Sequence, residues 1–206
     1  MGSLPQFFSN ALLESNIILA VRADFVLLIY TSTRIVTPFP LQEDRMTFDK
    51  NPFPTGDADR HALWEMLVRR DIDAFLAQDW GSVEEDFIAE SFFGMHAHFL
   101  NDADAWRLQF PRLEIYRDEW LRQAAETAKT AFAEPLREAL FRVTNMRDID
   151  VDGDRAVLHK KFNGQVAKAD GTFDKLNWQT LYFCRRVGPR WKIAGFVGYM
   201  PHPLGR

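Results

Sequence analysis

The chain has very little cysteine: Cys184 is the only one among 206 residues, which excludes an intrachain disulfide. A lone thiol fits a reducing compartment, so we expect a cytoplasmic protein. The one basic neighbour in its predicted strand, Arg185, points to the opposite face. No basic side chain in the strand therefore activates the thiol of Cys184, and the sequence argues against a cysteine nucleophile.

Long apolar runs are also lacking. The most apolar stretch, residues 17–30, is too short to span a membrane and contains Arg22 and Asp24. It has no basic start and no clear small-residue cleavage site, which argues against a signal peptide. We therefore expect no membrane partner. Because the composition changes after residue 40 and Pro and Gly mark a linker at 52–56, we expect residues 1–57 to be an N-terminal extension and linker.

No basic stripe follows any predicted element, and the formal net charge is −4, so we expect no nucleic-acid partner. The chain also lacks a phosphate-binding glycine-rich loop, a dinucleotide fingerprint, a G-x-S-x-G elbow and a CxxC pair. We expect no organic cofactor and no metal. The partner that remains is a small molecule.

Large aromatic side chains are abundant, with 18 Phe and 6 Trp in the chain. They suggest a roomy apolar interior. Apolar residues at helical spacing predict long helices over residues 61–79 and 113–133. Asp59 is the predicted N-cap of the first, and a capping box of Ser82 and Glu85 predicts a short helix after it.

The remaining residues indicate an antiparallel sheet. A first strand is predicted over 92–99, followed by an irregular loop over 101–110. Four further strands are predicted, joined by turns that contain glycine: 136–149, 155–166, 173–187 and 190–199. Helices followed by an antiparallel meander indicate an α+β fold, with the helices on one face of the sheet.

Four segments taken in order resemble the NTF2-like, or SnoaL-like, superfamily: residues 71–80, 85–94, 176–180 and 191–193. The resemblance covers residues 58–201. It implies a curved antiparallel sheet wrapped around helices as a cone-shaped α+β barrel, with a pocket at its open end and a homodimer formed through the sheet. The superfamily holds isomerases, dehydratases, polyketide cyclases, epoxide hydrolases and binding proteins, and a fold does not choose among them.

Asp71 is the sharpest candidate for a catalytic residue. On a helical wheel it lies near the centre of an apolar arc made by Trp64, Leu67, Val68 and Phe75. A carboxylate aimed at an apolar interior is costly unless it is paired or protonated, and burial tunes such a group for acid–base work. Steroid-isomerase-like members of the superfamily also project a catalytic side chain inward from this helix. The alternative is a structural Asp bonded to a backbone group or to an arginine such as Arg142.

His96 and His98 share one face of the first predicted strand, with Ala97 pointing away between them. If that face lines the pocket, the two can serve as acid or base. If it is the outer face, they are ordinary surface residues. A further alternative is a metal site with His159 or Asp71 as the third ligand, although H-x-H alone is a weak signal.

Five further side chains are candidates for substrate binding. His159 could reach the pocket or a subunit interface. Aromatic residues at the remaining positions are usually core, but they become pocket walls if a pocket exists. The set is Tyr116, Trp120, His159, Trp178 and Tyr182.

These observations predict a protein that binds a small, apolar, oxygenated molecule in its cone and transfers a proton on it without a cofactor, as an isomerase, dehydratase or cyclase does. Asp71 would be the base or its orienting partner, and His96 or His98 the partner acid or base. Tyr116 or Tyr182 would donate a hydrogen bond to a developing oxyanion. The last two strands carry no obvious inward carboxylate, as a cyclase-like base requires, and no Asp-Arg-Asp set of the epoxide-hydrolase kind is present. The rival hypothesis is a binding or dimeric interaction module that catalyses nothing.

Overall fold

The computed structural model describes residues 48–202, so most of the predicted extension, residues 1–47, lies outside the described residues. The last part of the predicted linker lies against the first helix, because the Asn51 side chain donates to the His61 carbonyl at 3.1 Å and to Glu65 at 2.9 Å. Asp49 forms ion pairs with Arg69 and Arg137.

The first helical run consists of α1 (Ala58–Trp64), a π-helical segment η1 (Glu65–Arg70) and α2 (Asp71–Ala77). The predicted N-cap was wrong. Asp57 caps the run by accepting from the Arg60 N–H, because the helix begins three residues earlier than predicted. Single π turns inside helices are often found at functional sites, and this one ends directly before Asp71.

The short helix predicted after this run is replaced by three 3₁₀ turns, η2 (Trp80–Ser82), η3 (Glu84–Asp86) and η4 (Ala89–Ser91). Ser82 does not act as the cap. Its N–H donates to the Asp79 carboxylate instead. Asp79 is thus the N-cap, and the segment that follows is a 3₁₀ turn, which is tighter than an α-helix. A fourth turn, η5 (Ala103–Ala105), lies in the predicted loop.

Two helices complete the helical layer. α3 (Leu113–Ala128) is the second predicted long helix. α4 (Leu136–Val143) lies where a strand was predicted, which is a correction. Its buried residues Ala139, Phe141 and Val143 alternate as in a strand, but its Leu, Arg, Glu and Ala residues favour a helix. Among residues 48–202, no helix is both long and apolar enough to cross a membrane.

The sheet has six strands in the order β2-β1-β6-β5-β4-β3 and is curved and open rather than closed. The strands are β1 (Phe93–His96), β2 (Arg107–Phe110), β3 (Thr144–Asp152), β4 (Arg155–Ala167), β5 (Phe173–Val187) and β6 (Arg190–Pro201). β2 was missed, because only four residues of the predicted loop pair with β1. Every neighbouring pair is antiparallel except β1 and β6, which run parallel.

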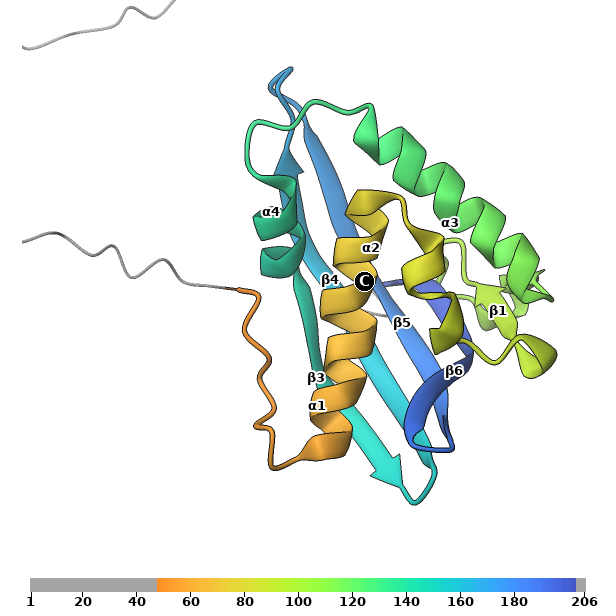
Figure 1. The fold of residues 1–206 in the computed structure, drawn as a ribbon. Coiled ribbons are helices and arrows are strands. Elements are labelled where there is room, and N and C mark those ends of the chain that lie inside the picture. Colours follow the sequence, from red (N-terminus) through yellow and green to blue (C-terminus); the bar gives the residue numbers. More distant parts are fainter. Residues whose placement is uncertain (1–47, 203–206) are drawn as a thin grey trace, which may run out of the picture. The chain divides into compact units, whose positions relative to one another are not determined.

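The helices lie on one face of this sheet, with α4 on one side of α2 and α3 on the other (Figure 1). Two buried clusters fill the space between the layers. One joins α1 and η1 to β3 and β4 through Leu63, Leu67, Met146 and Leu158. The other joins α3 to β6 through residues such as Trp120 and Phe196. The fold class is therefore α+β, as predicted.

Candidate functional site

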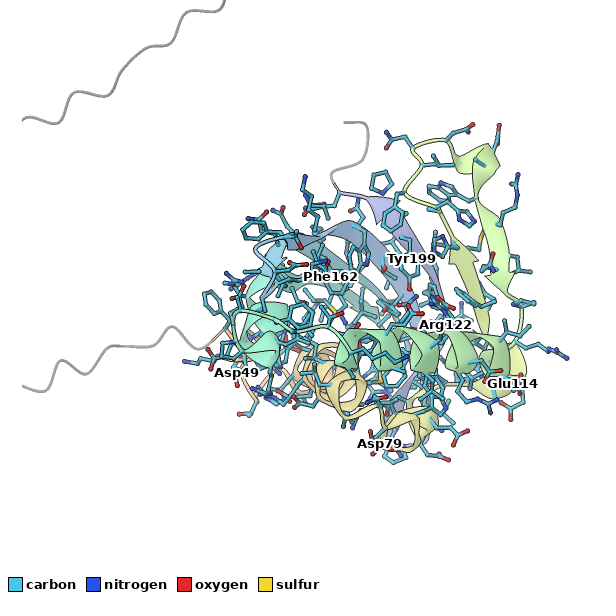
Figure 2. The ribbon with its side chains drawn as sticks, turned by 90° about the horizontal axis from the view of Figure 1, so that it is seen from above. Asp49, Asp79, Glu114, Arg122, Phe162 and Tyr199 are labelled. Atoms are coloured by element: carbon cyan, nitrogen blue, oxygen red, sulfur yellow. The ribbon has the colours of Figure 1, made fainter. Side chains whose placement is uncertain are left out.

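A cavity of about 460 Å³ lies between α2, α3 and α4 and the inner face of β4, β5 and β6. Its walls are largely apolar and aromatic, and include Phe75, Leu140, Phe162, Leu176 and Phe196. Phe162 and Tyr199 lie on the side of the sheet that faces α3 (Figure 2). An apolar cavity of this size with a few polar groups is typical of a small-molecule site.

Asp71 lies in this cavity, as predicted for an inward carboxylate, and it is paired. Lys160 Nζ donates to Asp71 Oδ2 at 2.7 Å and to the Leu67 carbonyl of the π turn at 2.6 Å. Trp120 Nε1 donates to the other carboxylate oxygen at 3.4 Å. The partner is therefore a lysine and not Arg142, which pairs with Glu134 at the surface.

Lys160 lines the cavity and was not among the residues that the sequence singled out. Its side chain is 1% exposed, whereas that of Asp71 is 32% exposed. In β4 it follows Ala156 and Leu158 on the buried face. A charged residue at a position whose side chain points to the buried face of a strand is costly unless it is paired. The alternation of buried and exposed positions along β4 could therefore have drawn attention to Lys160.

Tyr116 and Tyr182 supply two hydroxyl groups to the same cavity. Burial is the main reason that the pKa of each phenol is raised well above its usual value, so both stay protonated at neutral pH. Within residues 48–202 the structure gives neither hydroxyl a hydrogen-bond partner, and both side chains line the cavity. Both are therefore hydrogen-bond donors available to a ligand.

Tyr199 closes one side of the cavity. Gln123 of α3 donates through Nε2 to the Tyr199 hydroxyl at 3.2 Å, which joins β6 to α3 across the gap between the layers. Tyr199 has a φ of 56°, in the left-handed region that non-glycine residues rarely occupy. Such strain persists only where the surrounding structure holds the residue in place.

Neither His96 nor His98 lines the cavity. The His96 ring stacks on Tyr199, with ring centroids 4.0 Å apart, and its Nδ1 accepts from the His98 N–H at 2.9 Å. β1 ends at His96 rather than at residue 99 as predicted, and the chain turns at His98, which is exposed and has a φ of 53°. No group of three or more potential ligands occurs in the part of the chain that the structure describes, so the residues of the alternative metal site do not come together.

His96 should make the fold sensitive to acid. Burial, with a smaller effect of His98, lowers its pKa from 6.5 to about 4. Between these values the unfolded chain binds a proton that the folded protein does not. The free energy of unfolding therefore falls as the pH drops from about 6.5 to about 4, with no further loss from this group below that.

The measurement is urea unfolding of the wild type and of His96→Phe at several pH values in this window. We expect the variant to lose part of the slope, because its aromatic ring can still stack on Tyr199 without binding a proton. His159, whose pKa is also lowered mainly by burial, should leave some slope in both proteins. Identical slopes would contradict the assignment to His96.

The five predicted substrate-binding residues divide into two groups. Tyr116, Trp120, Trp178 and Tyr182 line the cavity. Trp178 stacks on Phe162, with ring centroids 4.5 Å apart. His159 lies on the outer face of the sheet, where its Nε2 is 2.5 Å from Gln179 Oε1. It belongs to a shallow groove with Asp148 and Val157 and not to the cavity.

No protein-family model and no curated protein sequence matches the chain. Among solved structures, an NTF2-like protein of unknown function from Pseudomonas putida KT2440 is 13% identical over 70% of this chain and 85% of that chain, with a TM-score of 0.45. An NTF2-like superfamily protein from Salmonella enterica serovar Typhimurium LT2 is 12% identical over 72% and 94%, also with a TM-score of 0.45. A protein from Novosphingobium aromaticivorans with a cystatin-like fold is 16% identical over 68% and 80%, with a TM-score of 0.43.

The order of the elements, the curved sheet and the helices on one of its faces are those that the resemblance implies. Identities of 12 to 16% concern the fold alone, and an NTF2-like fold hosts several activities. The function must therefore be argued from the cavity itself.

Proposed function

We propose that the protein binds a small, largely apolar molecule that carries an oxygen function in the NTF2-like cavity. The observation that carries this proposal is a polar cluster set among mainly apolar and aromatic walls, which also include a few other polar side chains such as Gln123 and Thr180. The cluster consists of the Asp71–Lys160 pair and the hydroxyls of Tyr116 and Tyr182. Apolar walls supply most of the binding energy, and a few placed donors orient the ligand's oxygen.

We further propose that the same cluster transfers a proton on this ligand, as a cofactor-free isomerase, dehydratase or cyclase does. Asp71 Oδ1 has only the long contact to Trp120 Nε1, so it can accept a proton from a carbon next to a carbonyl group. Tyr116 and Tyr182 are protonated donors for the oxygen on which negative charge develops. The set contains no histidine, because His96 is separated from the cavity by Tyr199.

The experiment is deuterium exchange into a panel of apolar ketones incubated with the protein in heavy water, followed by mass spectrometry. We expect exchange at carbons next to the carbonyl group, and we expect Asp71→Asn to reduce its rate by a factor of about 100 or more because the base is lost. Asp73→Asn is the matched control. Asp73 lies in the same helix, but it pairs with Arg137 and does not line the cavity.

Two outcomes would contradict the catalytic part of this proposal. One is exchange that is equally fast with Asp71→Asn. The other is binding of the ketones without any exchange in the wild type, which would support the non-catalytic binding module instead. Failure of every apolar oxygenated compound to bind would overturn the binding function as well.

We also propose that the protein is a cytoplasmic homodimer formed through the outer face of the sheet. Val157 and Phe183 oppose each other there on β4 and β5, and Val157 is 43% exposed. Phe93 of β1 lies beside Phe183, with ring centroids 5.8 Å apart. Exposed apolar patches on a sheet often mark an interface. Analytical ultracentrifugation should show a dimer that Val157→Glu converts to a monomer, and a monomeric wild type would contradict this.

A further inference from the structure

The amine of Lys160 has surroundings that suit covalent chemistry. It lies in an apolar cavity, its side chain is 1% exposed, and a carboxylate lies 2.7 Å from it. We propose that Lys160 forms a reversible imine with an apolar aldehyde or ketone that enters the cavity. This rests on the proposed binding function and names the class of ligand, which is a carbonyl compound rather than an alcohol or an acid.

The first step of the argument is the hydrogen bonding of the amine. Lys160 Nζ carries three N–H groups when protonated. Two of them donate to the Leu67 carbonyl and to Asp71 Oδ2. Among residues 48–202, no oxygen or nitrogen acceptor binds the third, and the nearest further group is the Phe162 ring, whose centroid lies 5.2 Å from Nζ. The nitrogen is therefore held in place by two contacts and keeps one position for a ligand atom.

The second step is the net charge of the Asp71–Lys160 pair. Asp71 and Lys160 together are neutral, so a ligand carboxylate placed against Lys160 would also face the negative charge of Asp71. A neutral carbonyl group avoids this repulsion. Its oxygen can accept from the hydroxyls of Tyr116 and Tyr182, which are protonated and line the same cavity. The part of the cavity beside Lys160 therefore favours a neutral carbonyl compound over an acid.

The third step is the chemistry. Lys160 passes a proton to Asp71 Oδ2 along their hydrogen bond, and the free amine forms a C–N bond to the carbonyl carbon. The carbonyl oxygen becomes a hydroxyl by taking a proton from the amine nitrogen through the tyrosines. Asp71 then returns its proton to this hydroxyl, the C–O bond breaks, and water leaves. The product is a cationic iminium group beside the Asp71 carboxylate, so the charge of the pair is conserved.

The iminium group would also help the proposed proton transfer. It withdraws electrons from the neighbouring carbon more strongly than a carbonyl group does, so a proton on that carbon is removed more easily. Asp71, regenerated as a carboxylate, lies beside that position. Lys160 and Asp71 would then act in sequence on one ligand, with the lysine as nucleophile and the aspartate as base.

The test is reductive trapping on the full chain. The protein is incubated with 2-naphthaldehyde and sodium cyanoborohydride at neutral pH, and the adducts are located by peptide mapping. A hydride from cyanoborohydride reduces the iminium group to a stable secondary amine. We expect one dominant adduct on Lys160, formed at least ten times faster than at any other lysine, and even labelling of the lysines after denaturation in urea.

Two variants sharpen the result. Lys160→Arg retains a cation for Asp71 but cannot form an imine, so the dominant adduct should disappear. Lys161→Arg is the matched control and should keep it, because Lys161 is the next residue in β4 and pairs with Asp148. Circular dichroism checks the folding of each variant. The peptide map of the wild type needs no variant and decides the question even if Lys160→Arg does not fold.

Two results would overturn the proposal, and they differ in what they say of the binding function. If naphthaldehyde shifts the fluorescence of the tryptophans but Lys160 is not trapped, the ligand binds and the imine is wrong. If the aldehyde neither binds nor reacts faster with the folded than with the unfolded chain, the cavity does not take this class of ligand at all.

Discussion

Asp71→Leu should lower the free energy of unfolding by about 3–5 kcal/mol, because it leaves the Lys160 ammonium buried without a carboxylate. Lys160 is the more buried member of the pair, with 1% of its side chain exposed, so water cannot replace the lost partner. The hydrogen-bond acceptor that remains for it is the Leu67 carbonyl. Urea unfolding followed by circular dichroism measures the loss.

The reverse substitution should cost less. Lys160→Met leaves Asp71 without its cation, but 32% of the Asp71 side chain is exposed to the cavity and can be hydrated. We expect a loss of about 1–3 kcal/mol. The double variant Asp71→Leu/Lys160→Met should regain most of the loss, because a buried pair replaced by apolar residues of similar size is often close to neutral.

This cycle has a clear contrary outcome. If Lys160→Met were more destabilising than Asp71→Leu, the carboxylate and not the amine would be the group without access to water. If the two losses simply added in the double variant, the residues would not interact in the folded protein. Either result would contradict the ion pair that the structure shows between Asp71 and Lys160 in the cavity.

Trp120→Ala should have the second large effect, a loss of about 3–5 kcal/mol. Trp120 is 6% exposed and packs edge-to-face against Phe75 and Trp80, each with ring centroids 5.4 Å apart. Removing the indole leaves a void beside an existing cavity and removes a donor to Asp71. We therefore expect weaker ligand binding as well as lower stability.

Trp106→Ala is the matched control for this substitution. Trp106 is partly exposed, and its Nε1 donates to the Leu100 carbonyl in the loop that precedes β2. Its removal should cost about 1 kcal/mol or less. A loss at Trp106 as large as that at Trp120 would mean that the cluster around Trp120 contributes little beyond the burial of one large side chain.

Local pattern predicted most of the sheet. The strand predicted over 173–187 has these bounds in the structure, because turn residues flank it and its side chains alternate. α4 was mistaken for a strand because its buried residues also alternate. β2 was missed because it has only four residues, of which Phe110 alone is buried, so no alternation marks it as a strand. Its pairing with β1 depends on tertiary contacts that periodicity does not encode.

The candidate site was predicted in part. Helical periodicity placed Asp71, Tyr116 and Trp120 on inner faces. Strand alternation put Trp178 and Tyr182 on one face of their strand, and the structure shows that this face lines the cavity. It could not identify the partner of Asp71, because 89 residues separate Lys160 from it. Alternation also could not decide on which side of β1 the histidines lie, since the chain turns away from the strand at His98.

The most direct test of the proposed cavity uses the six tryptophans of the chain, all of which lie within residues 48–202. Fluorine NMR of 5-fluorotryptophan-labelled protein, with each signal assigned by substitution, should be recorded during titration with 2-naphthaldehyde. The account predicts that the signals of Trp120 and Trp178 shift together and saturate, whereas those of Trp106 and Trp191 stay in place. Saturable shifts at Trp106 or Trp191 alone, or none at all, would contradict a binding site in the cavity.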